Sequence, residues 1–411
     1  MNSLRSFLSA EALAYVKLRY SVFSLAISGL TSILAGILLS KSEDLILAVP
    51  GLLVLLPAAL DIRGCIFGTL ASRLGSAFHI GTLKNFDVRN KVLRVNVFAS
   101  FSLSVVLSVY LGVISKILTY LFGLPAIPLE QLVSISLIAG LLSGVLLTIA
   151  SIWISFLAYR RSWDPDNVTS PLVTAIGDFF TIPSLIAAAL IVQHIGRYSE
   201  MIFYASVVLS LLSIFHVLIS SGAVPNSVNF KRIMMESMPV LALSGLLSAA
   251  SGVVLEAYVH TIIAIPVVLM FIPSFLETAG NITTILSSRV GSKLHLGLIK
   301  PDFKMKGQKL DEIINSMRLA YFIFPLLGIM AYYIGTFAGV GGLTLWDVVM
   351  LSVSSGIVLH LFLILMSMAI SIISFNHNID PDNVTIPIMT SVADIVSVLV
   401  ILGMVHVLGF V

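Results

Sequence analysis

The sequence predicts an all-α polytopic membrane protein with about eleven transmembrane helices, arranged as two parallel five-helix repeats joined by a linking helix. Composition, the length of the apolar runs and an internal duplication predict this class. The chain has 411 residues, of which 58% are hydrophobic and 10% charged, whereas a soluble domain has about 25% charged residues. Its apolar runs reach about 20 residues without the alternation typical of strands, so helices rather than a barrel satisfy the backbone in lipid.

Eleven apolar runs are long enough to cross a membrane. The residues before the first run lack the short apolar core and cleavage site of a signal peptide, so we expect a retained, amphipathic lead-in helix. The single cysteine, Cys65, excludes an internal disulfide and a cysteine-based metal cluster. We expect spans at residues 20–40, 45–72, 92–122, 130–159, 171–195, 200–221, 238–258, 260–288, 318–340, 345–375 and 386–411.

Positive charges are distributed unequally between the loops that these spans would connect. Nineteen of the 23 Lys and Arg residues fall in the N-terminal stretch or in loops on one side. Cytoplasmic loops carry an excess of such residues, so we expect a cell-membrane protein with a cytoplasmic N-terminus and an extracytoplasmic C-terminus. The most basic stretch, residues 289–318, is explained by this topological signal, and a lipid-headgroup or regulatory site there is the alternative.

Two separated blocks of the sequence recur in its second half at one constant offset. Residues 164–180 read DPDNVTSPLVTAIGDFF and residues 380–396 read DPDNVTIPIMTSVADIV, while residues 57–84 match 273–300 at the same offset. Each repeat contains five spans, and the sixth span returns the chain, so both copies start from the same side and share an axis along the membrane normal. We expect a first repeat at 1–195, a connecting transmembrane helix at 196–222 and a second repeat at 223–411.

Four acidic residues lie well inside predicted spans, away from the span ends, where charge is costly and is a functional hypothesis by default. They form two repeat-related pairs, Asp61 with Glu277 and Asp178 with Asp394. Arg63 lies two residues after Asp61 and offers it a local neutralising partner. No basic residue is near the other pair in the sequence, so we expect Asp178 and Asp394 to line a polar pathway.

Oxygen donors accompany these acids. A threonine lies four residues before each aspartate of the second pair, Thr174 and Thr390, on the same helical face. Asn281, after Gly280, offers an amide that either binds an ion or bridges helices. Hard divalent cations prefer oxygen ligands, and Mg²⁺ retains several of its waters. The predicted ligand set is therefore suited to Mg²⁺ as a transported ion.

The DPDN segments have two interpretations. Aspartate before proline is typical of a helix N-cap followed by a proline in the first turn, as at Asp164 and Asp380. At the mouth of an acid-bearing span, the same segments also predict an acidic vestibule that concentrates cations. Its residues would be Asp166, Asn167, Asp382 and Asn383.

At these blocks the chain resembles MgtE-type divalent-cation transporters, and most closely solute carrier family 41, whose members fuse two MgtE-like membrane units. The resemblance depends on PSFLETAGNITTILSSR at 273–289, its weaker partner at 57–73, and the PDN…P…D pattern at 165–178 and 381–394. It implies Mg²⁺ transport through a path between the two units, with Asp178 and Asp394 as the membrane aspartates.

Two departures from the family pattern stand out. Cys65 replaces the asparagine expected in the first repeat, which predicts unequal halves. Only about 20 residues precede the first predicted span, so we expect none of the soluble sensor domains of bacterial MgtE channels.

The sequence therefore predicts a transporter rather than an enzyme, since it contains no phosphate loop, dinucleotide fingerprint or nucleophile triad. The expected partners are a divalent cation and the lipid bilayer, with no nucleic acid. A fused pair of repeats is able to act as a monomer, and a homodimer stays open. The alternatives are a Mn²⁺, Co²⁺ or Zn²⁺ carrier coupled to H⁺ or Na⁺, an intramembrane aspartyl enzyme using Asp178 and Asp394, and a structural scaffold.

Overall fold

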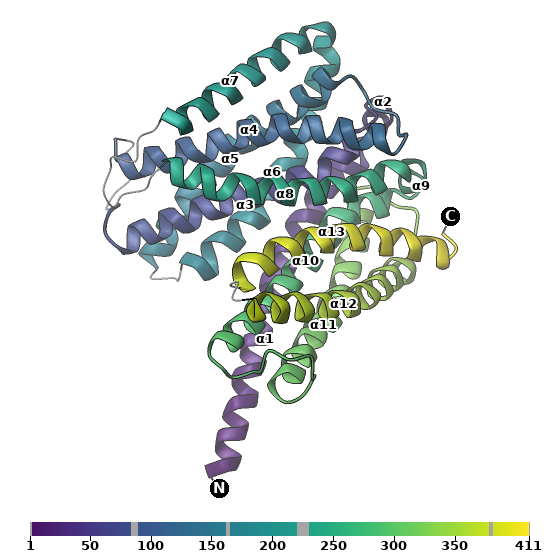
Figure 1. Cartoon of the computed structure of the whole chain (residues 1–411). Coiled ribbons are helices and arrows are strands. Elements are labelled where there is room, and N and C mark those ends of the chain that lie inside the picture. The colour runs from purple at the N-terminus through teal and green to yellow at the C-terminus, as the bar shows by residue number, and fades with distance from the viewer. Residues whose placement is uncertain (1, 84–88, 162–164, 220–229, 378–380, 411) are drawn as a thin grey trace. The chain divides into compact units, whose positions relative to one another are not determined.

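The computed structural model describes residues 2–83, 89–161, 165–219, 230–377 and 381–410. Within these ranges every regular element is a helix and no strand occurs, and eleven helices are long and apolar enough to cross a membrane. The predicted all-α polytopic class is confirmed (Figure 1). The helices are α1 (Asn2–Ser40), α2 (Glu43–Ala48), α3 (Leu52–His79), α4 (Lys91–Leu121), α5 (Leu129–Arg160), α6 (Pro165–Ile195), η1 (Gly196–Tyr198), α7 (Ser199–Ile219), α8 (Phe230–Ala257), α9 (Val259–Ile263), α10 (Pro266–His295), α11 (Gln308–Phe337), α12 (Leu345–Asn376) and α13 (Pro381–Val407).

The second predicted span, residues 45–72, is not one helix. The short helix α2 ends before Pro50, and α3 begins after Gly51. Pro50 has no backbone N–H to donate, and Gly51 has a φ of 92°, in the left-handed region that favours glycine. The apolar run hides this break because its residues are hydrophobic on both sides of the turn.

The eighth predicted span, residues 260–288, is interrupted in the same way. It contains α9 and then α10, whose first residue is Pro266, where the missing N–H costs no helical hydrogen bond. The long helices α3 and α10 also continue past the ends of the predicted spans. Arg73 and Arg289 therefore lie in these helices rather than in loops. Long cationic side chains reach the membrane surface from within a helix, and charge alone therefore does not end one.

The chain forms two compact units. Unit 1 comprises Met1–Ile33 with Met270–Val411, and unit 2 comprises Leu34–Leu269. These units do not coincide with the sequence repeats, because each takes the first helix of the other repeat. Residues Ser28–Ser32 of α1 contact α10 of the second repeat within unit 1, and α8 packs within unit 2 beside first-repeat helices. The first helix of each repeat therefore belongs to the unit that the other repeat forms, and we call α1 and α8 the exchanged helices.

Unit 2 is built around α3, which packs against α4, α5, α6 and α8. Serine hydroxyls join α5 to α3, since Ser151 donates to the carbonyl of Phe67 at 3.1 Å and Ser155 to that of Ala71 at 2.8 Å. Gly252 brings α8 close to α3: a side-chain carbon there would lie 2.5 Å from the carbonyl oxygen of Val54. Small residues thus permit the close helix contacts that lipid-embedded packing requires.

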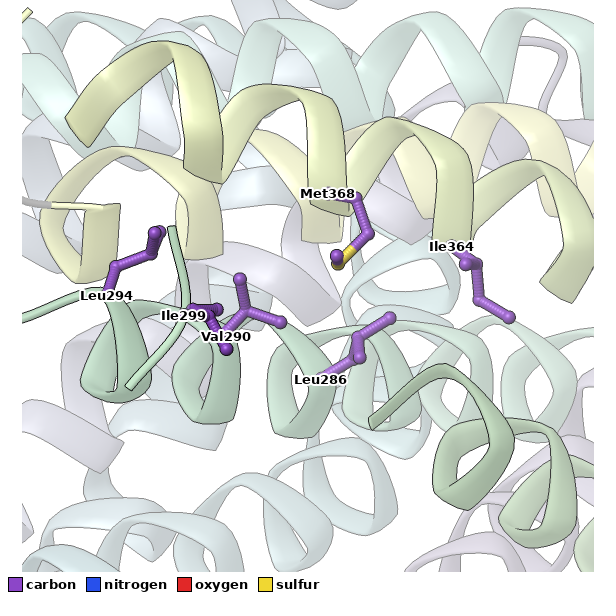
Figure 2. Packing of buried hydrophobic residues seen from close by; sticks show 6 residues of the cluster. All are labelled: Leu286, Val290, Leu294, Ile299, Ile364 and Met368. Carbon is purple, nitrogen blue, oxygen red and sulfur yellow. The ribbon is translucent and has the colours of Figure 1, made fainter. Parts of the chain in front are cut away.

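Unit 1 contains an apolar cluster between α10 and α12, shown in Figure 2. Leu286, Val290 and Leu294 of α10 lie against Ile364 and Met368 of α12. The hydroxyls of Ser287 and Ser367, 2.7 Å apart, join the same two helices. Ser367 is the repeat equivalent of Ser151, so a serine at this position links the corresponding pair of long helices in both units.

Candidate functional site

In unit 2, Asp61 of α3 is held by two serines of the exchanged helix α8. Ser244 donates to Oδ2 of Asp61 at 2.5 Å and Ser248 donates to the same oxygen at 3.2 Å. The two serines are four residues apart and share one helical face, and both are buried. The thiol of Cys65, one turn further along α3, lies 3.8 Å from Oδ1. Asp61 therefore lies in an internal polar contact rather than toward lipid.

In unit 1, Glu277 of α10 is held in the equivalent way by α1. Ser28 donates to Oε1 of Glu277 and Ser32 donates to Oε2. The amide of Asn281 donates to the hydroxyl of Ser28 at 3.3 Å. The repeat offset that relates Asp61 to Glu277 also relates Ser28 to Ser244 and Ser32 to Ser248, so both units build the same constellation.

Arg63 does not neutralise Asp61 as the local hypothesis supposed. Its Nη2 donates to the Ser108 hydroxyl at 3.0 Å and to the Ser136 carbonyl at 3.2 Å, on α4 and α5. Residues two apart on a helix do not face each other, so Arg63 is buried on another side of α3 from the carboxylate. Gly140 makes room for it, since a side-chain carbon there would lie 2.3 Å from Nη2.

Each acid-bearing helix also crosses the helix that carries the second acid of its repeat. In unit 2, a side-chain carbon on Gly64 of α3 would lie 3.0 Å from Cγ2 of Thr174 on α6, and one on Gly177 would lie 3.9 Å from the Cα of Gly64. Asp178 follows directly and is 5% exposed. The structure thus brings the helices of Asp61 and Asp178 together close to both residues.

The crossing recurs in unit 1. A side-chain carbon on Gly280 of α10 would lie 3.9 Å from Cγ2 of Thr390 on α13. Asp394 lies one turn after Thr390 and is half-buried. The helices that carry the predicted residues therefore meet next to them in both units: α3 and α6 at Gly64 and Thr174, and α10 and α13 at Gly280 and Thr390.

The predicted vestibule lies mostly outside what the structure describes. Asp166 and Asn167 fall in the first turn of α6, and Asp382 and Asn383 in the first turn of α13. Their side chains are not among the described ones, and the predicted caps Asp164 and Asp380 lie outside the described residues.

The serine pairs were missed by the sequence reasoning, although a signal for them exists. Residues 28–32 read SGLTS and residues 244–248 read SGLLS, at the same offset as the two longer blocks. Serines are common in apolar helices, so only their contact with the acids distinguishes them.

Glu256 was also missed, because it lies in the last turn of a span. It is 5% exposed and accepts hydrogen bonds from the backbone N–H groups of Gly51 at 2.8 Å and Leu53 at 3.2 Å. These are unsatisfied donors at the start of α3. Its repeat equivalent, Ser40, instead donates to the Pro266 carbonyl at 2.9 Å. Glu256 is thus a helix cap that fixes the break before α3.

The most basic stretch makes ion pairs of its own in unit 1. Lys293 lies 2.8 Å and Arg289 3.8 Å from Glu312 of α11. Lys309 is buried and bonds Asp302 at 2.5 Å. Much of the charge in residues 289–318 is therefore used in joining α10, α11 and the loop between them.

We call the acids and their neighbours in each unit a half-site; the two half-sites together offer carboxylates, hydroxyls, one amide and the Cys65 thiol. Among the described residues, no three His, Cys, Asp or Glu side chains gather in one metal-ligating group. A cation bound at either half-site would have few protein ligands and would retain water in its remaining coordination positions, which suits a hard, strongly hydrated ion.

These observations define a class: a polytopic helical membrane protein with paired intramembrane carboxylates. The family model of MgtE, described as a divalent cation transporter, matches residues 56–188 and 272–404. The chain belongs to this family. The two matches begin at equivalent positions of the two repeats, so they confirm both the duplication and the resemblance seen in the sequence.

The chain is also similar to members of solute carrier family 41. The chain is 25% identical over 281 residues to solute carrier family 41 member 2 of Gallus gallus, covering 66% of this chain and 47% of that protein. It is 21% identical over 395 residues to solute carrier family 41 member 3 of Rattus norvegicus, covering 90% and 82%. The matched part spans about half the length of the member 2 relatives. No solved structure matches the chain.

Proposed function

We propose that this protein transports divalent cations across a membrane and that Mg²⁺ is its main cargo. The observation that carries the proposal is the repeated constellation: in each unit an acid accepts hydrogen bonds from an SGLxS serine pair, beside a glycine crossing with the helix of a second acid. A scaffold protein has no need for four costly intramembrane carboxylates. Membership of a family described as divalent cation transporters supports the same function.

In this proposal Asp178 and Asp394 are the principal ligands of the hydrated cation. Thr174 and Thr390 add hydroxyl oxygens one turn away. Asp61 and Glu277, with Asn281, take a second rank, because serine hydroxyls already occupy part of their acceptor capacity. Asp166, Asn167, Asp382 and Asn383 would form the acidic mouths through which cations approach.

Protons compete with the cation for these carboxylates. Like-charged carboxylates near one transport path repel each other, and without a cation some take up protons. We propose that both half-sites serve one pseudo-symmetric path, because the duplication repeats every ligand type except the Asn281 amide, whose place Cys65 takes in the first repeat. The orientation with a cytoplasmic N-terminus, and function as a monomer, belong to the same proposal.

Metal flux in proteoliposomes tests the assignment. Asp178→Asn and Asp394→Asn are expected to reduce Mg²⁺ uptake to background, because an amide keeps the shape but removes the charge. Asp44→Asn, at an exposed acid at the start of α2, is the matched control and should transport normally. Normal uptake by both site variants would overturn the assignment.

Cys65 is the observation that favours a softer cargo. Its sulfur lies 3.8 Å from Asp61, and thiolates select softer metals such as Zn²⁺ or Co²⁺. Competition of Zn²⁺, Co²⁺ and Mn²⁺ with Mg²⁺ uptake, with and without H⁺ and Na⁺ gradients, decides between the two cargoes. Mg²⁺ uptake that persists in an excess of the softer metals supports the first.

A further inference from the structure

A groove of about 770 Å³ opens in unit 2 where α4, α7 and α8 meet. One end is basic: it is lined by Arg89, Lys91 and Arg94, from the turn before α4 and its first turn. All three are exposed. We call this feature the basic groove.

The remainder of the basic groove is lined by aromatic side chains together with Val95 and Val97. Phe98 of α4 lies 5.2 Å from Phe230 of α8 and 5.8 Å from His216 of α7, measured between ring centroids. Phe98 is 52% exposed, so its ring is accessible to an acyl chain. Phe101 continues the wall one turn further along α4. The lining therefore changes from cationic to apolar along a single helix.

The spacing along α4 fits half of a bilayer. Phe98 and Phe101 lie seven and ten residues after Lys91, which is about 10 and 15 Å at about 1.5 Å per residue. The hydrocarbon core is about 30 Å thick, so the aromatic wall reaches from the membrane surface toward its middle. A phospholipid has its anionic headgroup and acyl chain in this order.

We propose that the basic groove binds an anionic glycerophospholipid. Arg89, Lys91 and Arg94 would hold the headgroup phosphate, and Phe98, Phe101 and Phe230 would contact one acyl chain. Basic pockets between transmembrane helices are suited to such headgroups. A free phosphate ion would gain nothing from the aromatic wall, whereas a lipid matches both ends of the groove.

The positive charge of the basic groove is not shared by the second repeat, so it is not a by-product of the duplication. The equivalents of Arg89, Lys91 and Arg94 are Met305, Gly307 and Leu310. Lipid binding is thus expected at one repeat only. The lipid would contact α8 at its first residue, and α8 carries the serines that hold Asp61, so bound lipid should stabilise the exchanged helix within unit 2.

Lipid binding by the purified full-length protein tests the proposal. Native mass spectrometry and thermal unfolding would be recorded in detergent with phosphatidylglycerol, with phosphatidylcholine and with inorganic phosphate. Of these three ligands, only phosphatidylglycerol is expected to be retained and to raise the unfolding temperature of the protein. Arg89→Gln/Lys91→Gln/Arg94→Gln should weaken its binding by about 100-fold, given the contribution of each cation near anionic lipid.

A matched control removes three exposed charges from the other repeat: Lys300→Gln/Lys304→Gln/Lys306→Gln. It should bind phosphatidylglycerol like the unaltered protein. Equal weakening in both triple variants would mean a general charge effect and would overturn the site. Stabilisation by inorganic phosphate alone would overturn the lipid assignment. The single Lys91→Gln variant, with a smaller loss, serves if the triple variant is poorly folded.

Discussion

Asp61 in unit 2 and Glu277 in unit 1 occupy the same position of the duplicated sequence, and both accept hydrogen bonds from two serines of an exchanged helix. Their surroundings differ. One turn later stands Cys65 in one unit and Asn281 in the other, and Arg63 is replaced by Ala279. The shared part is the acid, the serine pair and the glycine crossing, while the neighbours have diverged.

The difference teaches that the two half-sites are similar in framework but unequal in chemistry. In unit 1, Asn281 joins the hydrogen-bond network through Ser28, so every group is a hard oxygen or nitrogen donor. In unit 2, a thiol takes that place, and a buried guanidinium lies elsewhere on the same helix. Substitutions that act on only one half-site are therefore the way to compare them.

The largest expected effect comes from breaking the helix exchange in unit 2. In Gly252→Ala the new methyl group would meet backbone atoms of Leu53 and Val54 at 2.5–2.8 Å. The backbone cannot move aside, so the free energy of unfolding should fall by about 3 kcal/mol. In unit 1, Gly29→Ala meets first the side-chain end of Leu327, which can rotate, and the loss should be smaller.

Thermal unfolding in detergent measures both glycine variants. Gly403→Ala is the control, because nothing lies within 4 Å of its new methyl group and alanine favours a helix. It should be neutral or stabilising. Equal losses for Gly252→Ala and Gly29→Ala would contradict the inference that α8 is packed against rigid backbone.

The serine pairs give the next largest effect. Ser244→Ala/Ser248→Ala removes the hydroxyl donors of Asp61, and Ser28→Ala/Ser32→Ala removes those of Glu277. Removing the serine donors of a half-buried acid should cost about 2 kcal/mol in either unit. The unit 1 variant should lose more, since Asn281 also depends on Ser28.

Unfolding free energy and Mg²⁺ uptake would be measured together for the two double variants. Ser213→Ala, whose hydroxyl donates only within its own helix α7, is the matched control. A larger loss in the unit 2 variant would reverse the predicted order of the half-sites.

The smallest effect concerns the Lys309–Asp302 pair of unit 1, whose equivalents in the first repeat of the sequence are Leu93 and Phe86. Lys309 donates to Asp302 in the loop between α10 and α11, and this hydrogen bond holds the Asp302 pKa below its ordinary value of 3.8. A lowered pKa stabilises the folded state above the ordinary value, and this contribution is lost as pH falls through the lowered pKa. Asp302 is solvated, so the contribution is small.

Comparing Asp302→Asn with the unaltered protein as a function of pH tests this pair. The unaltered protein should unfold at a slightly higher temperature at neutral pH, and the difference should vanish below the lowered pKa. A difference that grows on acidification would show that the sign is wrong. The exposed Asp44→Asn variant supplies a baseline without such a partner.

Much of the architecture follows from the sequence. The eleven spans, the constant offset between the repeats and the acids at Asp61, Asp178, Glu277 and Asp394 are found by counting apolar residues and comparing the two halves. The breaks before α3 and α10 were overlooked, although Pro50, Gly51 and Pro266 signal them. Apolar residues continue through both turns, so hydrophobicity alone does not reveal them.

The partners of the acids were not accessible in this way. Arg63 is near Asp61 in sequence but faces Ser108 and Ser136, because a helix turns neighbours two apart to different sides. Ser244, distant by 183 positions, is the actual donor. The direction in which each side chain leaves its helix decides the partners of Arg63, and the exchange of the first helices decides the partner of Asp61. The residues next to them in the sequence predict neither.

By itself the sequence determined the membrane class, the duplication and which residue types each half offers, because burial in lipid and internal repetition leave direct marks on composition and order. Tertiary structure alone decided that α1 and α8 change places, so that SGLTS meets Glu277 and SGLLS meets Asp61. The physical reason is that helices in lipid associate through close packing and polar contacts rather than through chain proximity. Two repeats with the same contact surface therefore admit either pairing, and only their packing selects one.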